Sequence, residues 1–229
     1  ALAGSTDVLN VGVTGADISG INSGAATTAE TLIISTLAGT SMTAAQLAGF
    51  TTVTATGSGG TAEAITITDA STTISAVSAV ESYVLTGAGA NTITVTGAAQ
   101  GVTTAAHASA QTIDTGALAS YTGTIAGNAT DTTTLVIGAG NTDVSGATLA
   151  IGANTGVQVL NQGTNTVTLS AAQHDSLIGI SATAAITGSG AITLDTADTT
   201  ITADATVGSY VLTGAGANTI TVTGAAQGV

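Results

Sequence analysis

The chain of 229 residues contains no lysine, arginine, proline or cysteine, and its thirteen acidic residues give a formal net charge of −13. Because no side chain can neutralise a phosphate, the composition argues against nucleic acids and anionic membrane surfaces as partners. The absence of cysteine excludes disulfides and thiolate chemistry. No apolar run reaches the roughly 18 residues expected of a transmembrane helix. Cations remain the natural charged partners of such a chain.

Short strands dominate the elements predicted along the chain. Residues 64–68, 92–96 and 165–169 place large apolar side chains at every second position, which is the period of a strand with one buried and one wet face. Glycine and asparagine between the strands tolerate positive φ and therefore suit sharp corners. Helical signals are confined to residues 42–49 and 169–177. Residues 100–109 are expected to form a corner or a loop.

A long internal repeat organises the chain. Residues 82–102 and 209–229 are identical, and the offset between Tyr83 and Tyr210 is 210 − 83 = 127. Upstream, Asp17 corresponds to Asp143 at an offset of 126. The chain is therefore divided into a first repeat copy (1–102), a connecting part of the repeat (103–127) and a second copy (128–229). Repeats of this kind build length and surface more often than a single catalytic pocket.

An elongated, all-β solenoid is the predicted fold. Short strands, corners of small residues and a thin aliphatic core suit coils that stack on one another, because each coil contacts only its neighbours. The alternative is a tandem of β-sandwich domains. The absence of tryptophan and proline argues against it, as does a repeat longer than the ~100 residues of an immunoglobulin-like module.

One short motif carries a family resemblance. Residues 87–93 read G-A-G-A-N-T-I, residues 214–220 repeat this order, and residues 4–9 and 138–144 are approximate matches. The motif resembles the Ca²⁺-binding nonapeptide of RTX proteins. The threonine, alanine and glycine content is similar to that of RTX-type S-layer proteins and giant surface repeat proteins of Gram-negative bacteria. The resemblance implies type I secretion, extracellular display and Ca²⁺-linked assembly. Asn91 and Asn218 depart from it, since the family has aspartate there.

Few residues are candidates for a site. Asp7, Asp17 and Asp143 lie beside glycine or asparagine corners and are the candidate Ca²⁺ ligands, because hard cations prefer oxygen ligands. His107 and His174 are expected to be solvent-exposed loop residues. No G-x-S-x-G elbow and no P-loop lysine occurs, so the chain is not expected to be an enzyme and no small-molecule substrate is expected. Tyr83 and Tyr210 occupy equivalent strand positions and are expected to be structural.

The sequence therefore predicts a structural segment of an extracellular bacterial filament, S-layer or surface repeat protein that self-associates. An adhesin stalk or a binding module is the first alternative. The second is an ice-binding solenoid, since flat threonine arrays order surface water. The predicted arrays begin at irregular intervals along the sequence, which argues against ice binding. Outward threonine is also an ordinary choice for a wet β face.

Overall fold

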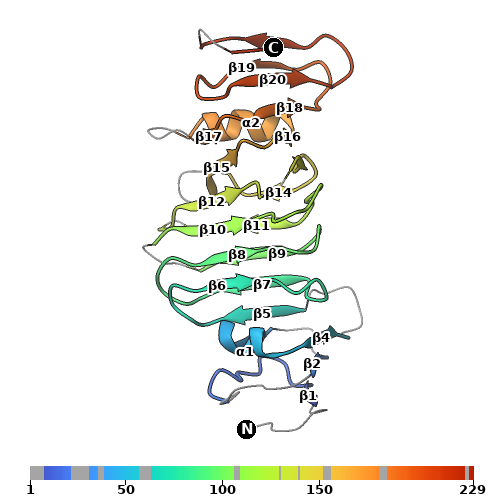
Figure 1. The fold of residues 1–229 in the computed structure, drawn as a ribbon, viewed down its shortest axis with the longest axis vertical. Coiled ribbons are helices and arrows are strands. Elements are labelled where there is room, and N and C mark those ends of the chain that lie inside the picture. Colours follow the sequence, from blue (N-terminus) through green and yellow to red (C-terminus); the bar gives the residue numbers. More distant parts are fainter. Residues whose placement is uncertain are drawn as a thin grey trace.

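The chain forms an elongated stack of coils built from short parallel strands (Figure 1). The computed structural model describes residues 8–21, 31–35, 39–56, 63–105, 109–128, 130–138, 140–151, 156–180, 185–224 and 227–229. Within these ranges the chain winds through about eight turns of a β-solenoid, and its paired strands are parallel. The predicted solenoid is confirmed. The sandwich alternative is wrong, because the sheets of such a sandwich are antiparallel.

Two six-stranded sheets form the middle of the stack. In order, the first sheet contains β3 (Thr40–Met42), β5 (Ala64–Ile67), β7 (Ser82–Leu85), β9 (Gly101–Thr104), β11 (Thr124–Ala126) and β14 (Thr148–Leu149). The second contains β6 (Thr73–Ser75), β8 (Thr92–Thr94), β10 (Gln111–Asp114), β12 (Thr133–Val136), β15 (Val157–Gly163) and β17 (Ile186–Gly188). From β5 to β12, successive strands along the chain alternate between the two sheets, so each coil adds to both.

Smaller sheets lie toward the two ends of the stack. The N-terminal sheet contains β1 (Val8–Val11), β2 (Thr31–Ile34) and β4 (Thr52–Ala55). Toward the C-terminus, one sheet contains β13 (Thr142–Asp143), β16 (Val167–Leu169), β18 (Ala191–Leu194) and β20 (Ser209–Leu212). The last sheet pairs β19 (Thr200–Thr202) with β21 (Thr219–Thr221).

The 127-residue repeat is visible as a repeat of structure. An offset of 127 takes β3, β5, β6, β7 and β8 to β16, β18, β19, β20 and β21. The two copies are joined within one continuous sheet. Strands β6, β8 and β10 of that sheet lead directly into β12, β15 and β17, whose pairing repeats that of β1, β2 and β4. The second copy thus begins on the sheet where the first copy ends.

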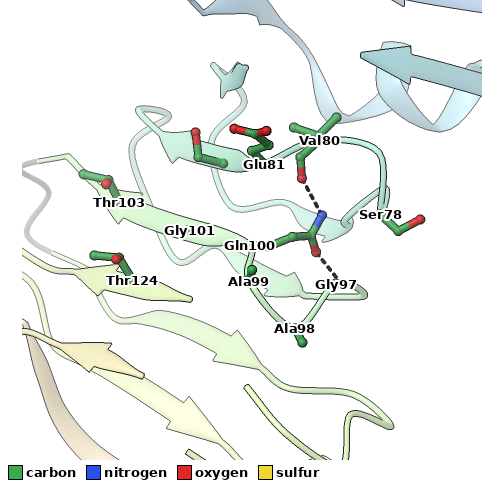
Figure 2. A pocket seen from close by; sticks show the side chains of 11 residues that line it. Ser78, Val80, Glu81, Gly97, Ala98, Ala99, Gln100, Gly101, Thr103 and Thr124 are labelled. Atoms are coloured by element: carbon green, nitrogen blue, oxygen red, sulfur yellow. Dashed lines mark hydrogen bonds between the residues drawn. The ribbon is translucent and has the colours of Figure 1, made fainter. Parts of the chain in front are cut away.

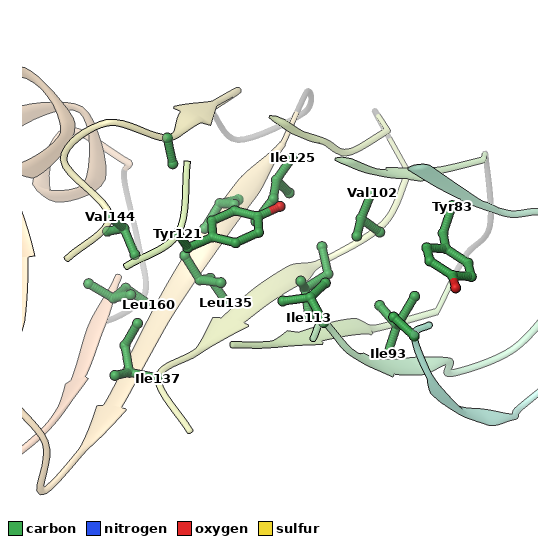
Figure 3. Close-up of a cluster of buried hydrophobic side chains, with 14 of the residues drawn as sticks. Tyr83, Ile93, Val102, Ile113, Tyr121, Ile125, Leu135, Ile137, Val144 and Leu160 are labelled. Atoms are coloured by element: carbon green, nitrogen blue, oxygen red, sulfur yellow. The ribbon is translucent and has the colours of Figure 1, made fainter. Parts of the chain in front are cut away.

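Inward-facing aliphatic side chains form a thin core along the stack. Ile93, Ile113 and Leu135 are neighbours in the register of β8, β10 and β12, and all three are fully buried (Figure 3). The side chains next to them in each strand point outward and are mostly threonine. Burial of each such aliphatic side chain contributes about 1.5–3 kcal/mol relative to exposure. Alternation with period two thus marks the inward side of β8, β10 and β12.

Within the described ranges, two short helices interrupt the coils where the sequence predicts them. They are α1 (Ala44–Gly49) and α2 (Ala171–Ile178), and each begins with a capping box, formed by Thr43 with Gln46 and by Ser170 with Gln173. Residues 100–109 were expected to form a corner or a loop, and the expectation is wrong for residues 101–104, which form β9 with Val102 and Thr104 facing inward. Gln100 lies at a corner, and residues 106–108 lie outside the described residues. No helix in the described ranges is long and apolar enough to cross a bilayer.

Glycine is required where two corners stack closely. A Cβ atom added to Gly87 would lie 1.6 Å from the backbone oxygen of Asp69 in the preceding coil. Gly89 in the same corner has φ +94°, which L-residues rarely adopt. The glycine spacing that resembles the RTX motif is thus needed here for the approach of two backbones.

Candidate functional site

Gln100 joins two successive coils at a corner (Figure 2). Its Oε1 accepts the backbone N–H groups of Thr96 at 2.9 Å and Gly97 at 2.8 Å. Its Nε2 donates to the carbonyl oxygens of Val77 at 2.7 Å and Val80 at 2.8 Å, which belong to the preceding coil. The side chain is buried and its amide is fully used. Gln100 therefore replaces strand pairing where the chain turns.

The same contact occurs at four places in the chain. Gln46, Gln173 and Gln227 each follow two alanines, as Gln100 does. Each donates to carbonyl oxygens of an earlier coil: Gln46 to Ile18, Ile21 and more distantly Ser19, Gln173 to Val144 and Ala147, and Gln227 to Asp204 and Val207. The spacing alternates between 100 − 46 = 54 and 173 − 100 = 73, which sum to 127. We call these four corners the glutamine corners.

Three buried tyrosines also join backbone segments. The hydroxyl of Tyr83 accepts the Val77 N–H at 2.7 Å, and that of Tyr210 accepts the Asp204 N–H at 2.7 Å. Tyr121 donates to the Gln100 carbonyl at 2.6 Å. Burial raises the pKa of Tyr83 and of Tyr210 to about 12, and it also raises the pKa of Tyr121. The expectation that Tyr83 and Tyr210 are structural is confirmed.

His174 is the point at which the two copies differ most in chemistry. The expectation of a solvent-exposed loop histidine is wrong for this residue: it lies in α2 with no exposed surface. Its Nε2 is 3.0 Å from the Tyr210 hydroxyl, and its Nδ1 is 3.2 Å from Asp175 Oδ1. The period-two pattern of the sequence does not reveal this burial, because α2 directs the polar side chain of His174 toward the coil that contains Tyr210. His107 lies outside the described residues.

The hydrogen bonds around His174 define its tautomer. The Asp175 carboxylate can only accept, so the proton of the neutral imidazole lies on Nδ1, facing Asp175. Nε2 is then the acceptor of the Tyr210 hydroxyl proton, and the Tyr210 oxygen accepts the Asp204 N–H. Burial lowers the pKa of His174 below its ordinary value, opposed by the hydrogen bond and charge of Asp175 and by the charge of Asp204. The neutral form is therefore the one that the fold accommodates.

The first copy has no polar counterpart of this cluster. At an offset of 127, His174, Asp175 and Asp204 correspond to Leu47, Ala48 and Val77. Only the tyrosine is retained, as Tyr83. Leu47 and Phe50 instead line an apolar cleft of about 290 Å³ between α1 and β6. The three polar residues thus occur together in one copy and are absent together from the other.

A larger open groove of about 750 Å³ lies beside the Gln100 corner (Figure 2). It is lined mainly by small side chains, and Glu81 is its only charged residue. No aromatic or arginine side chain lines it, although such residues usually anchor protein and sugar ligands. The groove offers a smooth, weakly polar surface and no group poised for chemistry.

The candidate Ca²⁺ ligands do not converge in the described structure. Asp17 and Asp143 are both exposed and lie at equivalent places in different copies, while Asp7 lies outside the described residues. Each carboxylate bonds its own turn: Asp17 Oδ1 accepts the Ser19 N–H, and Asp143 Oδ1 accepts the N–H and hydroxyl of Ser145. Bonds from Ser19 hold the pKa of Asp17 below its ordinary value. Among the described residues, no three acidic or histidine side chains cluster as a metal site would require.

Asn91 shows how the RTX-like corner is satisfied. Its Nδ2 donates to the carbonyl oxygens of Gly87 and Gly89 and to Gln111 Oε1, at 2.9, 3.3 and 3.1 Å. Its Oδ1 accepts the Thr72 N–H of the preceding coil. The two glycine carbonyl oxygens and Gln111 Oε1 thus accept hydrogen bonds from the Asn91 side chain.

Threonines form a regular row despite their irregular spacing in the sequence. Thr73, Thr92, Thr112 and Thr134 are direct neighbours on the outer face of β6, β8, β10 and β12. Of the arrays expected from the sequence, those that begin at Thr52, Thr66, Thr92 and Thr219 lie in four different sheets, in agreement with their irregular intervals. Within the sheet of β8, corners of different length bring other threonines into the row. The adjacent row is mixed: Ser75, Thr94, Asp114 and Val136.

No protein-family model matches the chain, and no curated protein or solved structure is significantly similar to it. The site residues therefore rest on the geometry alone. The sequence contains a signal for the glutamine corners, because the triplet Ala-Ala-Gln occurs four times. The His174 cluster was not, since its members lie up to 36 residues apart.

Proposed function

We propose that this chain is a structural segment of an extracellular bacterial filament, S-layer or surface repeat protein, and that its copies self-associate. The observation that carries the proposal is the recurrence of the glutamine corners in both copies, each tying a coil to an earlier one. A unit that repeats its inter-coil contacts in this way extends in length when copies are added. The proposed role is mechanical, without a catalytic activity or a small-molecule substrate.

The proposed location outside the cell rests on the resemblance to RTX-type surface proteins, which also suggests type I secretion. The composition is compatible with such surroundings. A chain without lysine or arginine has no trypsin site, and continuous parallel pairing leaves few backbone groups open to other proteases. Ca²⁺ is proposed as a bridge between carboxylates of neighbouring copies, with Asp7, Asp17 and Asp143 as the candidates.

Length is the property that tests this proposal. The chain and a version extended by one 127-residue copy are imaged by electron microscopy and measured by small-angle scattering. We expect rods of equal width whose length grows by the span of one copy. Incubation with a non-specific protease is the companion measurement, and we expect slow digestion. Compact particles, or rapid digestion of the rod, would contradict a mechanical role.

Ice binding is the second candidate, and the row from Thr73 to Thr134 favours it. Four threonines spaced by the ~4.8 Å distance between strands form one row across four neighbouring strands. The adjacent row, with Asp114 and Val136, interrupts a two-row array. Thermal hysteresis of the chain, compared with Thr92→Val and Thr112→Val, tests this candidate. An adhesin role would instead appear as a ligand on a glycan array, and the groove beside Gln100 has no anchor for one.

A further inference from the structure

Strand β6 has a free edge where a helix takes the place of a strand. It is a terminal strand of its six-stranded sheet, and of the described strands only β8 pairs with it. The chain runs from β3 into α1 before β4 and β5 bring it to β6, and α1 packs against β6. The strand ladder of this sheet therefore stops at β6, in the interior of the first copy.

The free edge of β6 presents four backbone groups. On the side of β8, the carbonyl oxygen of Thr72 accepts the Thr92 N–H. Because the backbone groups of successive residues in a parallel strand point to opposite neighbours, those of Thr73 and Ser75 face away from β8. No hydrogen bond within the described structure uses these groups, and both residues are exposed. A row of unpaired donors and acceptors of this kind is matched by the backbone of another extended chain.

An apolar cleft of about 290 Å³ lies along this edge. Leu47, Ala48 and Phe50 line it on the side of the helix, and Ile74 and Val77 line it on the side of the strand. No charged side chain is among its lining residues. Its volume is just below the roughly 300–1,000 Å³ of ordinary small-molecule pockets. The cleft therefore suits the small apolar side chains of a short, uncharged segment.

We propose that the free edge of β6 binds an extended, uncharged segment of a partner protein, which joins the sheet as one more strand. The backbone of this segment pairs with Thr73 and Ser75, and its alternate side chains enter the cleft. The strand on the other edge of β6 shows which sequence fits, because β8 reads Thr-Ile-Thr. A second copy of this chain is a less suitable occupant, since its described strands are already wound into coils.

The second copy of the repeat has a similar edge with different chemistry. Strand β19 is one of the two strands of its sheet and packs against α2, and its Thr202 corresponds to Ser75 at an offset of 127. At the same offset, two residues of the apolar lining correspond to Asp175 and Asp204. Covering two carboxylates with an apolar segment is unfavourable. The segment is therefore expected to bind at β6 and not at β19.

Binding of a labelled peptide tests this proposal. The probe is the pentapeptide Thr-Ile-Thr-Val-Thr, which has the sequence of residues 92–96 and carries a fluorophore, and its anisotropy is followed as the chain is added. We expect saturation at one peptide per chain. Ser75→Pro should weaken binding about tenfold or more, because proline removes an N–H of the free edge and leaves a peptide carbonyl unpaired. An edge strand tolerates proline where the ladder does not use the N–H.

Three further variants separate the edge from other causes. Thr202→Pro is the matched control at β19, and Ser75→Ala keeps the N–H at β6, so both should bind the peptide as the parent chain does. Ala48→Phe fills the cleft from the exposed side of α1 and should abolish binding without a change in the strand. Thermal melts establish that each variant is folded, and Ala48→Phe decides the question if Ser75→Pro does not fold.

Two results would overturn the proposal. The first is undiminished binding to Ala48→Phe and to folded Ser75→Pro, or an equal loss in Thr202→Pro, because the peptide would then bind elsewhere. The second is a dimer of the parent chain that Ser75→Pro abolishes, because a second copy would then be the occupant of this edge. Neither result bears on the proposed structural role, which the length of the rod tests.

Discussion

His174 and Tyr210 lie 36 residues apart in the chain and meet in the interior of the second copy, with Nε2 3.0 Å from the phenolic oxygen. At an offset of 127, Leu47 and Tyr83 occupy the corresponding positions in the first copy, and both are buried. One repeat therefore contains a buried histidine where the other has a leucine. The first copy, with Leu47, is therefore an internal reference for the effect of His174 in the second copy.

The second copy should be selectively sensitive to acid. The pKa of His174 is lowered in the folded chain, so the unfolded chain binds the proton more readily. The stability that neutral His174 contributes is present above the unfolded pKa of about 6.5 and is lost as the pH falls below it. Protonation would also direct an Nε2 proton at a hydroxyl whose own proton then lacks its acceptor.

His174→Leu measures this effect, because Leu47 shows that the fold accommodates leucine there. We expect the free energy of unfolding to fall less between pH 8 and pH 5 in this variant than in the parent chain. Both proteins retain His107, which cancels from the comparison. The reciprocal Leu47→His, which introduces no aspartate at positions 48 and 77, should add acid sensitivity to the first copy. Parallel stability curves for parent and His174→Leu would refute this assignment.

Gln100→Leu should destabilise the solenoid by at least about 3 kcal/mol. The change removes the partner of the Thr96 and Gly97 N–H groups and of the Val80 carbonyl, while the Val77 carbonyl keeps the Val80 N–H. Each buried polar group that is left unpaired costs about 1–3 kcal/mol. Gln227→Leu is the matched control, because the surrounding sequence is identical but the corner is partly open to water. It should cost under about 1 kcal/mol by chemical denaturation. Equal losses at the two corners would mean that burial does not set the strength of this contact.

Asn91→Asp should cost about 3–5 kcal/mol, since it replaces a buried donor with a charge that faces three oxygen atoms. The deficit should shrink at low pH, where a protonated carboxyl can donate again. Asn218→Asp alters the same sequence in the half-exposed last coil and should cost clearly less. Urea melts of both variants at two pH values provide the comparison. A neutral effect at Asn91 would show that the corner relaxes or admits a counter-ion.

Ca²⁺ should lower the concentration at which copies associate. Thirteen carboxylates without a basic partner repel one another when copies approach, and a divalent cation can bridge two of them. The chelator arm must match the ionic strength, because ordinary salt also screens this repulsion. A variant that combines Asp7→Asn, Asp17→Asn and Asp143→Asn should abolish the response, and Asp195→Asn, at another exposed position, should preserve it. Identical association in Ca²⁺ and in chelator removes the cation from the mechanism.

Several features of the fold were open to prediction because they depend on neighbours in the sequence. Alternation of Ile65 and Ile67 with threonine identifies the inward face of a strand, and the capping residues Thr43 and Ser170 mark the helix starts. The exact duplication of residues 82–102 identifies a stacking unit. Each of these signals lies within a short segment or in an exact sequence duplication, so it can be recognised without knowing which strands pair.

The sequence did not predict which residues of successive coils become neighbours. Thr73, Thr92, Thr112 and Thr134 are separated by 19, 20 and 22 residues, yet the corners bring them into one straight row. The contact of His174 with Tyr210 likewise depends on which coil lies above α2. Sequence spacing does not report how much chain a corner absorbs, and so it does not report which side chains become neighbours.

The sequence by itself determined that this protein is a stack of aliphatic-cored β coils with a 127-residue period. Tertiary structure alone decided which members of that stack are buried. Val102 and Val229 end the same 21-residue sequence, yet one is 1% exposed and the other 68%. The physical reason is that a coil shields only the coil beside it, so burial at any position depends on residues about twenty places further along the chain.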